Sequence, residues 1–109
     1  MHYVYVLRSA KDNDLYTGYT ADLRQRHAAH QAGKVASTRH RRPLHLIYYE
    51  ANLLAKDAKA RELFLKSGSG KRFIRKQLVH YFSSVIFLIR GLVSRSRTSV
   101  NAESARRAN

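Results

Sequence analysis

The chain has 109 residues, a length that allows one compact domain with a modest hydrophobic core and argues against a second domain. Its 21 Lys and Arg residues outnumber 7 Asp and Glu residues, and the net charge of +14 indicates a polyanionic partner: nucleic acid first, with a membrane surface or ribosomal RNA as alternatives. The absence of cysteine excludes disulfides, thiolate zinc sites and cysteine nucleophiles, and it suits the reducing cytoplasm, where we expect the protein to reside.

The first third of the chain predicts a hairpin followed by a helix. Aromatic and β-branched residues at 3–7 and again at 13–20 flank the polar turn SAKDND, as in two strands of a β-hairpin. Thr20 or Asp22 can cap the helix that follows, because both offer a side-chain oxygen to the free amides of a first turn. Gly33 is expected to end this helix.

The middle of the chain predicts one more strand and two more helices. A basic loop at 34–43 shows no helical periodicity, and the aromatic and branched run LHLIYYE at 44–50 predicts a third strand. Apolar residues recur at helical intervals in 53–66, and SGSG at 67–70 is expected to break that helix. A basic amphipathic helix is predicted at 71–82, with Phe and Leu on one face and Lys and Arg on the other.

After Ser83 the composition changes to Ser, Arg and Ala with little apolar material to bury. We therefore expect one domain over residues 1–82 and a poorly ordered basic tail over 83–109. The longest apolar run, VIFLI, is far shorter than the roughly 20 residues that cross a bilayer, so no transmembrane helix is expected. The predicted order of elements is β-β-α-β-α-α, and the fold class is α+β with one small sheet.

Three other kinds of site are disfavoured by their residue patterns. His27 and His30 lie three apart, but neither an HExxH motif nor a carboxylate at matching spacing accompanies them, which argues against a zinc site. A serine hydrolase would need GxSxG or an equivalent arrangement, and none is visible. SGSGK resembles the end of a phosphate loop but lacks the first glycine and a following Ser or Thr.

One set of polar residues offers the parts for cutting a phosphodiester. A phenol can act as base or positioner, a guanidinium can stabilise the charge on phosphorus, and a carboxylate can hold one divalent metal. Arg26 and His30 are four residues apart, so they share one face of the predicted helix. The candidate catalytic residues are Tyr5, Tyr16, Arg26, His30 and Glu62, with Gly18 between the second strand and the helix.

The ordered set YVY, YTG eleven residues later, LRQR and a histidine resembles the GIY-YIG endonuclease family. The resemblance covers about residues 2–82, and LFLKSGSGKRFIRKQL is also similar to the short stand-alone bacterial members. It implies a three-stranded antiparallel sheet flanked by helices and one divalent ion, Mg²⁺ or Mn²⁺. It also implies site roles: Tyr5 and Tyr16 as the motif tyrosines, Gly18 as the structural glycine, Arg26 as the essential arginine, His30 as the histidine four later, and Glu62 as the metal ligand.

The sequence departs from the family pattern in two places. Tyr3 stands where the first motif has Gly, and Thr17 stands where the second has Ile, but both replacements are compatible with a strand. The late asparagine of some members has no match, because SGSGK occupies that region and offers only small hydroxyls.

The leading hypothesis is a metal-dependent endonuclease acting on branched, nicked or single-stranded DNA in DNA repair or processing, with RNA as a second possible polymer and a monomer as the expected state. The rival hypothesis is a nucleic-acid-binding module without turnover on the same fold. A membrane-surface protein is disfavoured because YFSSVIFLIRGLV is more apolar than amphipathic. The basic residues expected to contact nucleic acid are Arg24, Arg39, Arg41, Arg42, Lys71 and Arg72.

Overall fold

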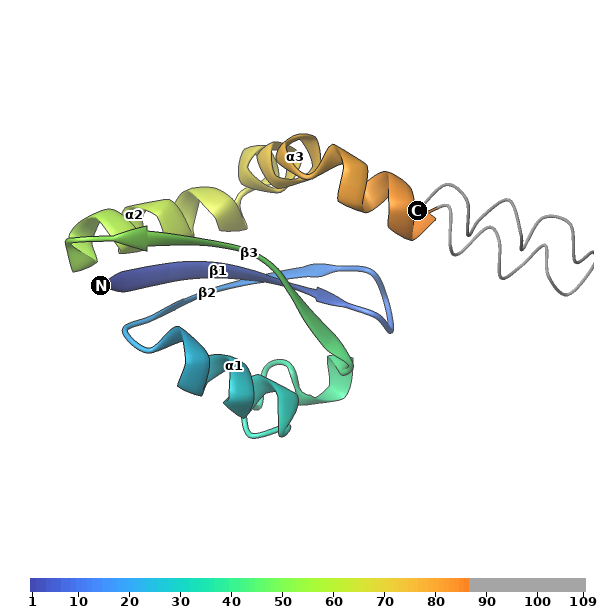
Figure 1. Cartoon of the computed structure of the whole chain (residues 1–109), viewed down its shortest axis with the longest axis horizontal. Helices are drawn as coiled ribbons and strands as arrows, with labels where there is room; N and C mark the ends of the chain where they lie inside the picture. The colour runs from blue at the N-terminus through green and yellow to red at the C-terminus, as the bar shows by residue number, and fades with distance from the viewer. Residues whose placement is uncertain (87–109) are drawn as a thin grey trace, which may run out of the picture. The chain divides into compact units, whose positions relative to one another are not determined.

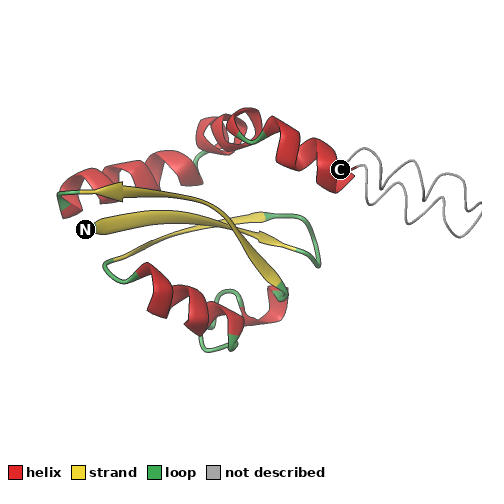
Figure 2. Ribbon diagram, in the orientation of Figure 1, coloured by secondary structure: helices red, strands yellow, loops and turns green. Residues whose placement is uncertain are grey.

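Three antiparallel strands form a single sheet with the spatial order β2-β1-β3 (Figures 1 and 2). In the computed structural model, which describes residues 1–86, β1 spans His2–Ser9, β2 spans Leu15–Thr20 and β3 spans Leu44–Asn52. The first strand therefore lies in the centre and pairs with both others. The predicted α+β class, the three-stranded sheet and its antiparallel pairing are confirmed.

The hairpin between β1 and β2 places the two tyrosine motifs side by side. Tyr5 pairs with Gly18 and Leu7 pairs with Tyr16 across the two strands. The turn is tight because Asn13 adopts a positive φ of 65°, a conformation that Asn tolerates better than most residues. Its amide also donates to the carbonyl of Ser9 at 2.8 Å, which closes the loop.

Helix α1 spans Leu23–Gln31 and has the caps that the sequence predicted. The Asp22 carboxylate accepts a hydrogen bond from the Gln25 amide at 3.0 Å, and the Thr20 hydroxyl accepts one from the Asp22 amide at 3.0 Å. At the other end Gly33 has a φ of +76°, which favours glycine and prevents the helix from continuing. A short 3-10 helix, η1, follows at Arg39–Arg41.

The two faces of the sheet are covered by different helices, with α1 on one side and α2, Ala55–Lys66, on the other (Figure 1). Because side chains alternate along a strand, Tyr5 and Leu7 face α1, whereas Val4 and Val6 face α2. All four are at most 1% exposed. The core on the α1 side consists of Tyr5, Leu7 and Leu44, against which Tyr16, Leu23 and Leu46 pack.

The SGSG segment corrects one expectation, because it forms the start of helix α3, Gly68–Gln77, rather than a linker before a helix at 71–82. Ser67 precedes the helix, and its hydroxyl accepts a hydrogen bond from the Gly70 amide at 3.1 Å in the manner of an N-cap. A side chain at Gly70 would collide with the backbone of Phe64 and Leu65. The glycine therefore permits the close turn from α2 into α3.

The described residues divide into two compact units, one ending at residue 71 and the other beginning at residue 72. In the second unit the predicted apolar face is present, since Ile74 and Phe82 are buried and the Arg75 guanidinium lies 5.1 Å from the centre of the Phe82 ring. Residues 79–86 are helical. Of the tail expected at 83–109, the part from residue 87 onward lies outside the described residues. Within residues 1–86 no helix is long and apolar enough to cross a membrane.

Candidate active site

Tyr5 is the central residue of the candidate site. It lies on the middle strand and is 1% exposed, and its ring passes over Gly18 on β2. A Cβ at position 18 would overlap the phenol ring and its hydroxyl. The glycine of the YTG motif is therefore required here by the close approach of a catalytic candidate to the neighbouring strand.

A buried chain of two hydrogen bonds joins β1, α1 and the loop before η1. The Tyr5 hydroxyl lies 2.7 Å from His30 Nε2, and His30 Nδ1 lies 2.8 Å from the hydroxyl of Thr38. His30 and Thr38 are both fully buried. Both ring nitrogens of His30 are therefore engaged, which fixes the orientation of the imidazole beside the phenol.

Burial sets the protonation states of this pair. The pKa of His30 is lowered to about 4, mainly because burial disfavours the cation and further because Arg26 and His27 add positive charge nearby. The pKa of Tyr5 is raised by burial, and the hydrogen bond from Arg26 opposes that rise. At neutral pH the pair thus consists of a neutral phenol and a neutral imidazole.

Arg26 and Tyr16 form the half-buried part of the site. The Arg26 Nε–H donates to the Tyr5 hydroxyl oxygen at 3.4 Å, a long hydrogen bond, and the pKa of Arg26 is raised first by this contact. The Tyr16 ring centre lies 5.3 Å from that of His30 and 6.4 Å from that of Tyr5. A substrate phosphate approaching Tyr5 would therefore meet a guanidinium and a second phenol.

Glu62 lies on α2, the helix that covers the opposite face of the sheet. Its charge is a minor cause of the raised pKa of Tyr5, after burial of the phenol. Its side chain is 21% exposed and its Oε2 lies 3.2 Å from Lys66 Nζ. Mg²⁺ is commonly held by one or two carboxylates together with waters and substrate phosphates, so the donor set of this site fits such an ion. Within residues 1–86 no three His, Asp or Glu side chains lie close enough together to hold a metal ion by themselves.

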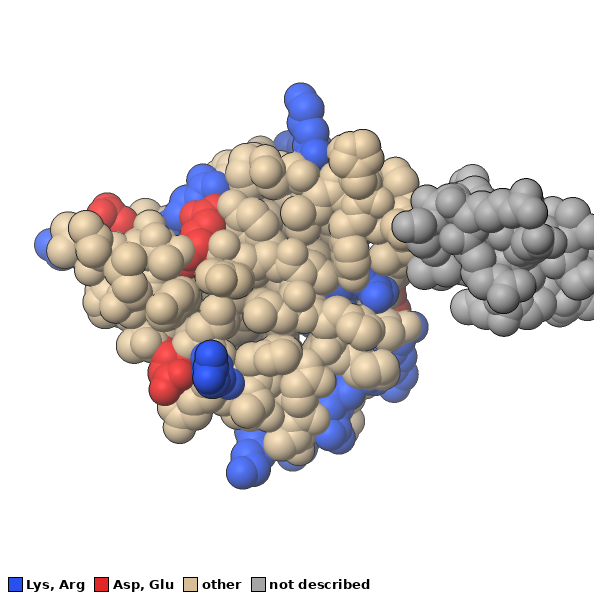
Figure 3. Space-filling view, in the orientation of Figure 1, with Lys and Arg blue, Asp and Glu red and all other residues tan. Residues whose placement is uncertain are grey.

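The structure separates the basic residues that the sequence grouped together. Arg24 is exposed on α1, Arg39 at the start of η1 and Arg42 just after η1. The Arg41 guanidinium instead lies 3.6 Å from carboxylate oxygens of Asp12 and Asp14. Arg41 thus holds the hairpin turn. Lys71 Nζ lies 3.8 Å from Asp14, and Arg72 belongs to the second unit. In Figure 3, Lys and Arg side chains line the border of the molecule where Figure 1 places α1 and the segment after it.

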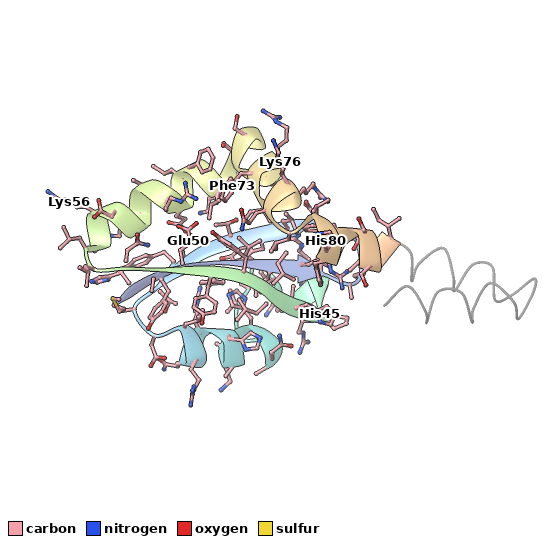
Figure 4. All side chains as sticks on the ribbon, turned by 45° about the horizontal axis from the view of Figure 1, so that its top comes forward. His45, Glu50, Lys56, Phe73, Lys76 and His80 are labelled. Carbon is pink, nitrogen blue, oxygen red and sulfur yellow. The ribbon has the colours of Figure 1, made fainter. Side chains whose placement is uncertain are left out.

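A second acidic side chain lies on the opposite face of the sheet and serves as a comparison. Glu50 points from β3 toward α2 (Figure 4), where Arg61 Nε and Nη2 each donate to its carboxylate at 2.9 Å. The Tyr48 hydroxyl donates to Glu50 at 2.7 Å. The hydrogen bonds from Arg61 lower the pKa of Glu50. This cluster stabilises the packing of α2 on the sheet and is not part of the tyrosine site.

Thr38 was missed by the sequence interpretation. It lies in the basic loop 34–43, where neither periodicity nor a motif distinguishes it from the neighbouring Ser and Arg residues. Its role depends on a hydrogen bond to a residue eight positions earlier, which only the folded loop creates.

Of the five candidate catalytic residues, four form one contiguous group, and the fifth, Glu62, acts on that group through its charge.

Comparison with known proteins identifies the family of this chain. Residues 1–76 match the model of the GIY-YIG catalytic domain, and the chain therefore belongs to the GIY-YIG family of nucleases. A UPF0213 protein of Staphylococcus haemolyticus is 43% identical over 75 residues, which cover 68% of this chain and 90% of that protein. A UPF0213 protein of Streptococcus pyogenes serotype M5 is 45% identical over 83 residues, or 75% of this chain and 85% of the relative. No solved structure matches the chain.

Proposed function

We propose that the protein is a metal-dependent endonuclease that hydrolyses phosphodiester bonds in DNA, with a role in DNA repair or processing. The observation that carries the proposal is the 2.7 Å contact between the Tyr5 hydroxyl and His30 Nε2, beside Arg26 and Tyr16. A binding module has no need for a buried neutral histidine aligned on a phenol. A hydrolase needs a proton acceptor at such a position.

The proton route follows from the protonation states. Because the pKa of Tyr5 is raised, the phenol does not ionise by itself at neutral pH. When water attacks phosphorus, the Tyr5 oxygen accepts a proton from the water while its own proton passes to His30 Nε2. This transfer requires the tautomer in which Nδ1–H donates to Thr38, and the hydroxyl of Thr38 lies 2.8 Å away to accept it. His30 then carries the positive charge.

Three further residues, Arg26, Tyr16 and Glu62, act on the phosphate in this proposal. Arg26 turns away from its long hydrogen bond with Tyr5 and toward the phosphate, which leaves the Tyr5 oxygen free to accept a proton. In this position the guanidinium stabilises the charge that develops on the equatorial oxygens of the phosphate. Tyr16 donates its hydroxyl to the phosphate or the water. Glu62 would hold Mg²⁺ or Mn²⁺, and such an ion would supply positive charge that favours phosphodiester cleavage.

A labelled panel of single-stranded, duplex, flapped and branched DNA, incubated with Mg²⁺, tests the proposal. The natural chain should cut at least one member, and Glu62→Gln should bind the same member without cutting it. Glu50→Gln is the matched control, because it changes a carboxylate of the same type on β3 that is already paired with Arg61. It should lose stability but retain cleavage.

Two results would each contradict part of this proposal. Salt-sensitive binding without cleavage of any substrate would leave the rival, a nucleic-acid-binding module on a nuclease fold. Equal cleavage by Glu62→Gln and the natural chain would show that the metal ligand has been placed wrongly.

A further inference from the structure

A pocket of about 480 Å³ lies beside the tyrosine site on the α1 side of the sheet. Its walls come from β1, β3 and the first turns of α1, and they include Tyr3, Tyr49, Leu23, Leu46, Arg24 and His27. The volume falls within the roughly 300–1,000 Å³ typical of small-molecule sites. None of these six residues takes part in the proton route through Tyr5 and His30.

Two tyrosines give the pocket its character. Tyr3 and Tyr49 have ring centres 6.3 Å apart at an interplanar angle of 62°, an edge-on arrangement in which one ring braces the other. Tyr49 is 56% exposed, although it stands on a sheet face whose other aromatic residues are largely covered. An exposed ring held by a neighbour in this way offers a flat surface on which a planar ligand can stack.

The charged groups at the rim favour an anionic ligand with polar edges. Arg24 and His27 are three residues apart on α1, so both point from the same side of the helix toward the pocket. Asp22 also lines the pocket, but its carboxylate caps α1 and is a hydrogen-bond acceptor rather than a site for phosphate. A phosphate therefore fits beside Arg24 and His27, and a group with N–H donors fits beside Asp22.

The pocket adjoins the candidate active site directly. Tyr49 is the cross-strand partner of Tyr5, and Leu23 packs against the core cluster that contains Tyr5. His27 lies near enough to His30 for its charge to lower the pKa of that residue. A nucleic-acid strand that places one phosphate at Arg26 would therefore bring a neighbouring nucleotide to the pocket.

We propose that this pocket binds one unpaired nucleotide of the substrate strand, with its base stacked on Tyr49 and its phosphate at Arg24. The inference rests on the proposed function because it takes nucleic acid as the substrate, but it does not require that the strand be cut. A base inside a duplex is stacked on both faces, so its ring cannot reach Tyr49 without being unpaired and turned outward. Strands with unpaired nucleotides next to the cut should consequently be preferred over continuous duplex.

The experiment measures stacking separately from cleavage. Short single strands carrying 2-aminopurine are titrated with the full chain in metal-free buffer, because stacking quenches the fluorescence of this base. Quenching is expected with both DNA and RNA strands. The strand that binds with the higher affinity is the polymer that the pocket prefers. Tyr49→Ala should abolish the quenching and weaken binding by about 5- to 100-fold, the range expected from the loss of one stacked base, whereas Tyr49→Phe should preserve both.

Two control variants separate stacking from general effects. Tyr19→Ala removes an aromatic residue from the opposite face of the sheet, where its ring stacks on His2, and should leave quenching unchanged. Arg24→Gln should reduce the slope of log affinity against log salt concentration by about one, as expected for the loss of one phosphate contact. If Tyr49→Ala quenches like the natural chain, or if a duplex binds as tightly as a single strand, the pocket proposal is wrong.

The outcomes also distinguish this inference from the proposed function. Quenching that depends on Tyr49, together with no cleavage of any substrate in Mg²⁺, would support the pocket and refute the nuclease. Cleavage that is the same in Tyr49→Ala and the natural chain, with no quenching in either, would refute the pocket and leave the nuclease intact.

Discussion

The Tyr5 hydroxyl and His30 Nε2 lie 2.7 Å apart although 25 residues separate them in the chain. One residue comes from the central strand and the other from the last turn of α1, and both are buried. A buried polar pair is stable only when each member is satisfied. The Thr38 hydroxyl on one side and the Arg26 guanidinium on the other supply the remaining partners.

Tyr5→Phe should abolish cleavage while preserving the fold. The phenyl ring fills the same space beside Gly18, but His30 Nε2 loses its partner, which should cost about 1–2 kcal/mol of unfolding free energy. We expect the cleavage rate to fall by about 10² or more, because without the Tyr5 hydroxyl the proton of the attacking water has no route to His30. Tyr48→Phe, which removes a hydroxyl bonded to Glu50 on the opposite face, is the control and should cut normally. Equal rates for the two variants would contradict the proposed route.

The stability of the protein should depend on pH through His30. The folded-state pKa of about 4 lies below the usual 6.5, so the unfolded chain binds more protons between these values. The stabilisation is complete above pH 6.5 and is lost as the pH falls toward 4, an effect of about 3 kcal/mol at most. Denaturation at pH 7 and pH 4 should show a larger loss of unfolding free energy in the natural chain than in His30→Gln, which keeps the other titrating groups, such as Glu50. Parallel curves for the two proteins would show that His30 titrates normally.

Thr38 is expected to act as a positioning residue. Thr38→Val keeps the shape but removes the oxygen that lies 2.8 Å from His30 Nδ1, so the tautomer with a free Nε2 is no longer held. We expect the cleavage rate to fall by about tenfold or more and the acid limb of the pH–rate profile to move, with little change in KM. Thr38→Ser should restore both. A purely structural role would instead lower stability in Thr38→Val without moving the pH profile.

Gly18→Ala should destabilise the hairpin through one specific collision. The new Cβ would overlap the Tyr5 ring, and such overpacking typically costs about 1–3 kcal/mol. In a Tyr5→Leu background the colliding atoms are absent, so the same substitution should cost much less. Chemical denaturation of the four proteins gives the coupling energy. An equal cost in both backgrounds would mean that the ring is not what requires glycine at this position.

Several features of the structure could be predicted from local chemistry alone. Alternating aromatic and branched residues predicted the three strands, Asp22 and Gly33 predicted the two ends of α1, and the order of Tyr5, Tyr16, Arg26 and His30 indicated the family. These signals depend on neighbours within a few residues or on a motif. The break that SGSG predicted after Lys66 is present, but the next helix begins at Gly68 rather than at 71, because Ser67 caps it and Gly70 packs on α2.

Composition, periodicity and motif order were enough to predict the α+β class, most strands and helices, the excess of positive charge and the candidate catalytic residues. Which side chains meet depends on how the whole chain packs. The loop 34–43 folds back to place Thr38 against His30, Asp12 and Asp14 draw Arg41 into the hairpin turn, and the pairing of β1 with β3 sets Tyr49 opposite Tyr5. Such contacts join residues distant in the chain, and they arise from packing, whose outcome no local pattern records.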